Sequence, residues 1–321
     1  MPPPPLSGTA SNKRKRSASR TSDDSTPDLS LSIRTEHYRT NVLQLNGVFI
    51  ASSLAVSRAP QCVRDTVHTV LGKPRTPLAA KTLETWVQDI VRVEDDRKEA
   101  ITTALAHILP PAAFDAHLQR KDKQSFTHPK NMLPRVTDIP DPLAANVPRI
   151  AGPVPDVAYG LSNAAFEREQ RLAMTIPPIS DVCEPIAGLF WPFFVVEFKA
   201  QAEMGTIYAA INQCAGSGSA CIKAQEVLRG LHDAVDQPSL SLSCALDGRS
   251  AELLCHHLSD DRTRYHVAIV GRYLLADASH LKRLHFHVHN IVTWGLSSHR
   301  DWVHRRLDAQ WERAMSRGSA G

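Results

Sequence analysis

The sequence lacks several patterns that would each define a functional class. Its six cysteines include no C-x-x-C pair, so nothing indicates a structural zinc site or a disulfide framework. The sequence contains neither a P-loop nor a G-x-G-x-x-G fingerprint, which excludes the usual nucleotide-cofactor motifs. No apolar run approaches the ~20 residues that span a membrane, and the proline-rich start at Met1–Pro5 has no signal-peptide core. We expect free thiols in a reducing compartment and no membrane partner.

An excess of one charge sign is also missing. The 37 basic and 33 acidic residues give a formal net charge of only +4. Because the N-terminal tail already carries a basic cluster, the rest of the chain is close to balanced, and net charge alone does not indicate a nucleic-acid binder. The 321 residues, of which 42% are hydrophobic and 22% charged, have an ordinary globular composition. They suffice for one large domain or two smaller ones.

Residues 1–32 are rich in Pro, Ser, Thr and charged side chains and contain few large apolar ones. Such a segment cannot offset its ordering entropy by burial, so the composition predicts a disordered tail. Within it, the basic cluster Lys13–Arg16 is typical of a nuclear import signal, with a solvated basic patch as the alternative. We therefore expect a nuclear protein, and otherwise a cytoplasmic one.

The next part of the chain, residues 33–135, is predicted to be mostly helical. Apolar residues between Leu83 and Leu109 recur near helical spacing, and Pro110-Pro111 ends the pattern. The proline-rich segment Phe126–Pro155 predicts an extended connection. Beyond it we expect an α/β domain over residues 136–310 and a C-terminal tail over residues 311–321.

From Pro155 onward the pattern alternates between strands and helices. The apolar, β-branched and aromatic run Phe193–Phe198 predicts a central strand buried on both faces. Thr206 can cap a long helix over Ile207–Leu231. The other predicted elements are a strand at Val157–Tyr159, a helix at Asn163–Met174, strands at Ser239–Leu246, Ala251–Leu258 and Arg264–Tyr273, and a helix at Arg300–Met315. The segment Leu281–Trp294 remains open between strand and helix.

Two opposite charges stand at the end of the apolar strand. Because alternate residues of a strand face the same side, Glu197 and Lys199 project together. Burying charges is costly unless they are paired or bound to a metal. The pattern therefore indicates a functional site, and its plainer alternative is a structural ion pair on an edge strand.

Phosphodiester hydrolysis explains this set of residues. Mg²⁺ or Mn²⁺ prefers carboxylate oxygens, and the expected metal ligands are Glu197 and Asp156, which follows Pro155 at the start of a short predicted strand. Asp181 lies nearer to Glu197 in sequence and is the competing ligand. Lys199 would orient the attacking water or stabilise the negative charge that develops on the phosphate.

These residues carry a family resemblance. Pro155-Asp156 followed by Glu197-Phe198-Lys199 on a strand resembles the PD-(D/E)XK nuclease superfamily. More closely, Trp191–Lys199 followed by Ala210–Gly216 resembles a fungal family of uncharacterised proteins related to that superfamily. The resemblance runs from about Pro155 to Leu307. It implies a restriction-endonuclease-like core, with a mixed central sheet flanked by helices, and a metal-dependent hydrolase that acts on DNA or RNA.

The resemblance also implies a catalytic glutamine on the helix after the strand, and Gln213 matches it. The tyrosine expected four residues later is replaced by Ser217. An upstream helical glutamate is implied as well, and Glu84, Glu94 and Glu99 all stay open for that role. Independently of the family, small residues along this helix predict a close approach to the sheet: Ala209, Ala210, Ala215, Gly216, Gly218 and Ala220.

Histidines offer a second candidate metal site. His285, His287 and His289 would share one face of a strand and could bind a transition metal, but they would spread around a helix. His256 and His257 would point to opposite faces of their strand.

Taken together, the sequence supports a metal-dependent nuclease first. The alternative is a catalytically inactive nuclease-fold module that binds nucleic acid or protein.

Overall fold

The computed structural model describes residues 32–51, 55–76, 78–92, 102–103, 105–127, 132–135, 140–200, 206–230 and 237–318. Residues 1–31 of the predicted disordered tail, with the basic cluster Lys13–Arg16, lie outside the described residues, as do Glu94 and Glu99. Contacts group Leu31–Gly321 into one compact unit. The boundaries expected at residues 135/136 and 310/311 therefore fall inside that unit.

A mixed β-sheet runs through the described residues, with seven strands in the order β1-β7-β6-β5-β4-β3-β2. The chain is therefore an α/β protein. Strands β2, β3 and β4 pair antiparallel, as do β5, β6 and β7. The pairs β4–β5 and β1–β7 are parallel. The strands are β1 Val48–Ile50, β2 Leu118–Asp122, β3 Val157–Leu161, β4 Phe190–Phe198, β5 Leu240–Leu246, β6 Ser250–Leu258 and β7 Tyr265–Leu274.

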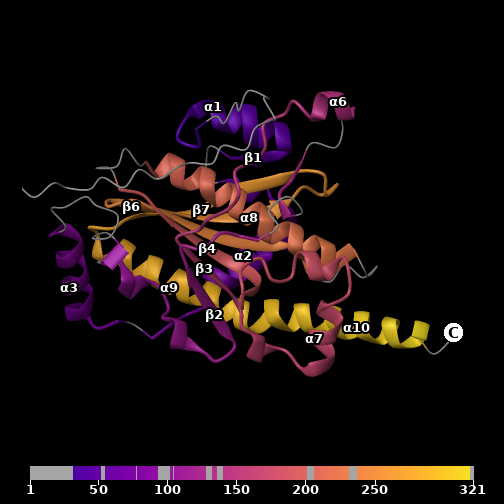
Figure 1. Ribbon diagram of the computed structural model, residues 1–321. Helices are drawn as coiled ribbons and strands as arrows, with labels where there is room; N and C mark the ends of the chain where they lie inside the picture. The colour runs from indigo at the N-terminus through magenta and orange to yellow at the C-terminus, as the bar shows by residue number, and fades with distance from the viewer. Residues whose placement is uncertain are drawn as a thin grey trace, which may run out of the picture. The chain divides into compact units, whose positions relative to one another are not determined.

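Helices cover both faces of the sheet (Figure 1). Helix α8, Ile207–Gly230, lies on one face of the sheet. Helix α9, Ala278–Trp294, lies on the other face and continues through the π-helix η9, Gly295–His299, into α10, Arg300–Gly318. The shorter described helices and turns are α1 Glu36–Tyr38, η1 Arg39–Leu43, η2 Gln44–Asn46, η3 Ala55–Arg58, α2 Gln61–Leu71, α3 Ala80–Val91, η4 Ala106–Ile108, η5 Ala112–Phe114, α6 Asp141–Ala144, η6 Asn163–Ala165, α7 Arg168–Met174 and η7 Ile179–Asp181.

The predicted strands of the α/β part are confirmed, with small shifts at their ends. Strand β4 begins three residues earlier than predicted, at Phe190, and all nine of its residues are buried. It is thus a central strand packed on both faces, as its apolar sequence predicts. The N–H of Ala209 donates to Thr206 Oγ1 over 3.2 Å, which confirms the predicted cap of α8.

The region 33–135 is not helical throughout. It contributes β1 and β2, the two edge strands of the sheet. Both are short, at three and five residues, so they carry too few alternating positions to stand out against the surrounding helical periodicity. The predicted helix Asn163–Met174 is also divided, because Phe166 and Glu167 are extended and a capping box of Glu167 and Gln170 starts α7.

The open segment is a helix, so the strand arrangement of its histidines is wrong. In α9, His287 Nδ1 lies 2.6 Å from the hydroxyl of Tyr273. His285 and His289, one turn apart, instead contact each other with ring centroids 4.1 Å apart. Within the described ranges, no group of three or more His, Cys, Asp or Glu side chains is placed to hold a metal ion.

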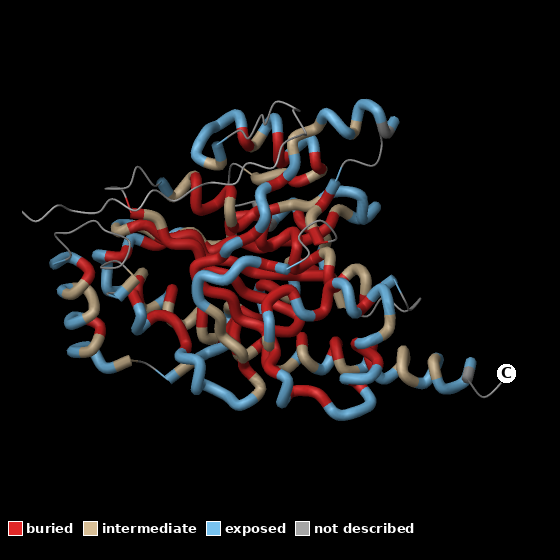
Figure 2. The backbone as a smooth tube through the Cα atoms, in the orientation of Figure 1, coloured by how far each residue is buried: buried red, intermediate tan, exposed pale blue. Residues whose placement is uncertain are grey.

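Helix α8 packs close to the sheet at Gly218. A Cβ atom added at Gly218 would lie 2.3 Å from the ring of His256 on β6, so no larger residue fits there without movement. The prediction of a slim helix against the sheet is confirmed. Figure 2 shows the result as a continuous buried zone through the strands and α8.

Two further properties follow from the described residues. All six cysteines are free thiols; Cys62 is exposed and the other five are buried. No helix in the described ranges combines the length and the apolarity needed to cross a bilayer.

Candidate functional site

The antiparallel pairing of β3 with β4 brings Asp156 next to Glu197. Val157 pairs with Val196, so continuing the register by one residue places Asp156 directly opposite Glu197 at the end of the ladder. Residues opposite each other in register point to the same face of a sheet. The two acids are 41 residues apart in sequence, and only the strand pairing joins them.

Hydrogen bonds hold Asp156 at this end of the sheet. Its Oδ2 accepts from the backbone N–H of Phe198 over 2.8 Å, and its carbonyl oxygen accepts from the N–H of Lys123 over 3.0 Å. The residue is only 7% exposed. A backbone donor aimed at a carboxylate fixes both its position and its orientation.

Glu197 and Lys199 lie on the same face, as predicted. Lys199 Nζ is 3.9 Å from Glu197 Oε2; the lysine side chain is 15% exposed and the glutamate 1%. The backbone N–H of Lys199 donates to the carbonyl of Leu246 at the end of β5. Because β4 has β3 on one side and β5 on the other, the alternative of an ion pair on an edge strand is wrong about the strand's position.

The competing acid, Asp181, lies elsewhere. It is exposed in η7, and the carbonyl of nearby Cys183 accepts from the N–H of Trp191 at the start of β4. Glu197 lies six residues further along the strand, roughly 20 Å away at ~3.3 Å per residue. Asp181 therefore belongs to the opposite end of β4.

Helix α8 covers the face on which Glu197 lies. Burial, and after it the charge of Glu197, raises the pKa of the Cys214 thiol well above its usual value, while Ser243 and Lys199 lower it. Cys214 packs in the same buried cluster as Ala245, the β5 partner of Glu197, so it lies over the face that carries the Glu-x-Lys pair. Sequence reasoning missed this residue, although its spacing of four from Ala210 puts both on one helix face.

The residues that family resemblance added are placed less centrally. Gln213, one position before Cys214, is half-buried, and its Oε1 is enclosed without a hydrogen-bond partner among the described residues. Glu84 is exposed on α3, which packs against α9 on the other side of the sheet from α8. It is therefore not brought to Glu197.

Besides Asp156, a third carboxylate shares the face of Glu197, and the sequence pattern did not reveal it. Glu197 pairs with Ala245 on β5, and Ala245 pairs with Glu252 on β6. The three residues form one row beneath α8, with only a methyl group between the two acids. Glu252 Oε1 lies 3.1 Å from Arg272 Nε, while its Oε2 is buried.

The donor set suits a hard divalent cation. Mg²⁺ is commonly bound by one or two carboxylates, with water and substrate phosphate completing its shell. Asp156 and Glu197 supply two carboxylates at the same strand end. Soft or borderline metals would prefer thiolate or imidazole ligands, and the buried Cys214 has a pKa raised away from thiolate formation. The residues present therefore fit Mg²⁺ or Mn²⁺ better than zinc.

Comparison with known protein families assigns the chain to one family. Residues 85–307 match the family described as a domain of unknown function, DUF7924. The match covers about two thirds of the chain, so the protein belongs to this family. It includes Asp156, Glu197 and Lys199 together with all of α8. No curated protein matches the sequence.

Proposed function

We propose that this chain is a metal-dependent nuclease of the PD-(D/E)XK type, with a restriction-endonuclease-like core. The antiparallel strands β2, β3 and β4, followed by α8 and the parallel strand β5, support this proposal. They form a mixed sheet flanked by helices, which is the architecture that the resemblance implies. DNA or RNA is the proposed substrate.

One observation carries the proposal. The carboxylate of Asp156 accepts a hydrogen bond from the backbone N–H of Phe198. In the sequence, Phe198 is the residue between Glu197 and Lys199. Two acids distant in sequence and one lysine thus meet at one strand end. These charges do not make the fold more stable, because burying a charged side chain costs free energy that burying a hydrophobic side chain does not. The arrangement therefore supports a functional role.

The residues suggest a division of labour. A divalent ion held by Asp156 and Glu197 would polarise the scissile phosphate and lower the pKa of an attacking water. The Phe198 N–H keeps the Asp156 carboxylate in place before substrate arrives. The ammonium of Lys199 supplies positive charge close to Glu197, where it can stabilise charge that develops on the phosphate oxygens. The apolar residues of β4 limit water around these groups.

The experiment is a cleavage assay with the full chain on single-stranded and double-stranded DNA and RNA. We expect cleavage with Mg²⁺ or Mn²⁺ and none with excess chelator. Glu197→Gln should abolish it, and Asp181→Asn, at the far end of β4, is the matched control that should retain it. Cleavage that persists in Glu197→Gln, or is lost equally in Asp181→Asn, would contradict the assignment.

A second function is favoured by the burial of the site. Glu197 is 1% exposed and lies beside Lys199, which also suits a catalytically inactive nuclease-fold module that binds nucleic acid or protein. That function predicts no cleavage with any divalent ion and nucleic-acid or protein binding that Glu197→Gln leaves unchanged. Direct binding measurements on the same two variants separate the two functions.

We also propose nuclear import through Lys13–Arg16, on the basis of the clustered positive charge alone. Alanine at these four positions in a fluorescent fusion should reduce nuclear accumulation. Unchanged accumulation would reject the role.

A further inference from the structure

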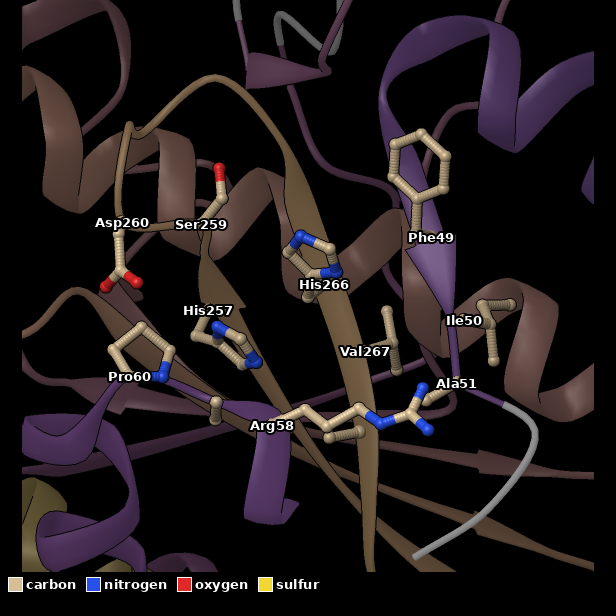
Figure 3. A pocket seen from close by; sticks show the side chains of 12 residues that line it. Phe49, Ile50, Ala51, Arg58, Pro60, His257, Ser259, Asp260, His266 and Val267 are labelled. Carbon is tan, nitrogen blue, oxygen red and sulfur yellow. The ribbon is translucent and has the colours of Figure 1, made fainter. Parts of the chain in front are cut away.

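A pocket lies at the end of the sheet opposite to the Glu-x-Lys pair. Strand β6 runs antiparallel to β5 and ends at Leu258, so its last residues lie at the other end of the strands from Leu246 and Lys199. The pocket has a volume of about 420 Å³, within the range of small-molecule sites. It opens between the strands β1, β6 and β7 and the segment that leads into α2 (Figure 3).

Three rings form one wall of this pocket. Phe49 on β1 pairs with His266 on β7, which pairs with His257 on β6. The ring centroids are 5.8 Å apart for Phe49–His266 and 5.5 Å for His257–His266, with interplanar angles of 29° and 20°. The rings therefore form a nearly parallel row across three strands, and Figure 3 shows them side by side along the pocket.

The protonation of the two histidines in this row follows from their surroundings. His257 Nδ1 lies 2.9 Å from the carbonyl of Leu258, so this nitrogen carries the hydrogen and donates, which leaves Nε2 as an acceptor. Burial lowers the pKa of both His257 and His266, so both rings are neutral near pH 7. The adjoining turn is fixed by Asp261, which accepts from the N–H and hydroxyl of Thr263. The wall thus offers aromatic carbon and neutral polar edges without rearrangement.

Positive charge lies beside the wall. The guanidinium of Arg58 extends across the pocket below His266 (Figure 3), and within the described part of the chain it makes no hydrogen bond or ion pair. Arg264 lies over Phe49, with its guanidinium carbon 5.6 Å from the ring centroid. The carboxylate of Asp260 is on the other side, next to Pro60 (Figure 3). The pocket therefore has a cationic side and an acidic rim.

We propose that this pocket binds a nucleoside monophosphate, in which a planar heteroaromatic base is joined through a sugar to a phosphate group. The phosphate pairs with Arg58, whose planar guanidinium suits two phosphate oxygens. The ring lies against the wall, where His257 Nε2 accepts from an exocyclic amino group and Ile50, Pro60 and Val267 supply apolar contact. A metal ion is disfavoured, because the two arginines repel it and the described residues provide no third ligand.

Isothermal titration of the full chain in excess chelator tests this proposal. The probes are adenosine 5′-monophosphate, adenosine and ribose 5-phosphate, which separate the ring from the phosphate. We expect the nucleotide to bind at least ~10-fold more tightly than either fragment, because each lacks one of the two contacts. Equal binding of ribose 5-phosphate would overturn the ring contact, equal binding of adenosine would overturn the phosphate contact, and no binding would overturn the site.

Variants assign the contacts. Arg58→Gln should weaken the nucleotide ~10-fold or more and leave adenosine unchanged, whereas His257→Phe should weaken both. Arg249→Gln is the matched control, since Arg249 is exposed on the turn at the opposite end of β6. A nucleotide affinity that Arg58→Gln leaves unchanged would overturn the proposal. Because no divalent ion is present, failure here leaves the proposed nuclease untouched, and failure of cleavage leaves this result untouched.

Discussion

The two ends of the sheet carry polar groups in different physical settings. At one end, Asp156 and Glu197 lie on interior strands beneath α8, with 7% and 1% of their surface exposed. At the other, His257 and His266 line an open pocket next to the edge strand β1. Interior carboxylates need a backbone donor, a cation or a metal, whereas the neutral imidazoles at the pocket wall carry no charge that must be compensated. The difference explains why charge marks the first site and aromatic rings mark the second.

The two sites also differ in how the chain assembles them. The acids and Lys199 lie within residues 85–307, the part that matches the family. Phe49 and Arg58 precede that part. Strand β1 brings Phe49 to His266 by pairing with β7, and η3, which also contacts β7, carries Arg58. The pocket therefore exists only where the N-terminal region completes the sheet, which makes it a feature of this longer unit and not of the matched part alone.

Removing one key charge from each site gives the largest expected effects. Glu197→Gln should reduce cleavage by ~10³-fold or more, because it removes a charged metal ligand worth several kcal/mol at the transition state. Its nucleotide affinity should stay unchanged. Arg58→Gln should show the reverse, with cleavage of a long substrate retained and nucleotide affinity lowered. Cleavage rates and titrations on both variants measure this, and a variant that loses both properties would show that the two ends are coupled.

Lys199→Ala should reduce cleavage by ~10²–10³-fold, because it removes one preorganised charge from the transition state. Unlike Glu197→Gln, it should leave Mn²⁺ binding largely intact, since the lysine is not a ligand. Titration of Mn²⁺ into both variants provides the comparison. Equal loss of Mn²⁺ binding in the two would mean that the pair acts as one structural unit.

Acid should destabilise the fold, with a larger contribution from the fully buried histidines His256 and His299 than from the histidines at the pocket. Burial lowers the pKa of His256 to about 3 and that of His299 to about 4, against ~6.5 in the unfolded chain. Between about pH 6.5 and 4 the unfolded state binds more protons, so the free energy of unfolding falls as the pH falls. Each fully buried histidine contributes up to ~1.4 kcal/mol per pH unit in that window.

Urea unfolding at pH 7, 6 and 5 measures this slope. His256→Gln, which keeps a polar atom near Ser243, should flatten it, and His257→Gln should flatten it less because His257 is next to the open pocket. The same slope in the wild type and His256→Gln would contradict the assignment.

The smallest effect concerns the packing of α8. Gly218→Ala should destabilise the protein by ~1–3 kcal/mol, because the added methyl group would lie 2.3 Å from the His256 ring. Gly230→Ala, at the end of the same helix with nothing within 4 Å of the added atom, is the matched control and should be neutral or stabilising by up to ~1 kcal/mol. Thermal or urea unfolding decides between them, and equal effects would mean that the close approach of α8 is not required.

The central elements and two site residues were accessible from sequence for local reasons. Strand β4 is a run of apolar and β-branched residues, Thr206 is a helix cap, and alternation alone places Glu197 and Lys199 on one face. The short edge strands β1 and β2 were not accessible, because their pairing partners decide their conformation. The helix α9 was ambiguous because its histidines alternate like a strand, and the hydrophobic pattern on either side fits both forms.

The sequence by itself thus determined the buried strand, its two terminal charges and the slim helix that follows, since each depends on neighbours within a few residues. Only the tertiary structure decided that Asp156 and not Asp181 stands opposite Glu197, because a strand register joins residues 41 positions apart. It also decided that Glu252 shares their face through Ala245, and that Phe49, His266 and His257 form one wall. Register is set by the packing of whole strands against helices on both faces, and no short stretch of sequence contains that information.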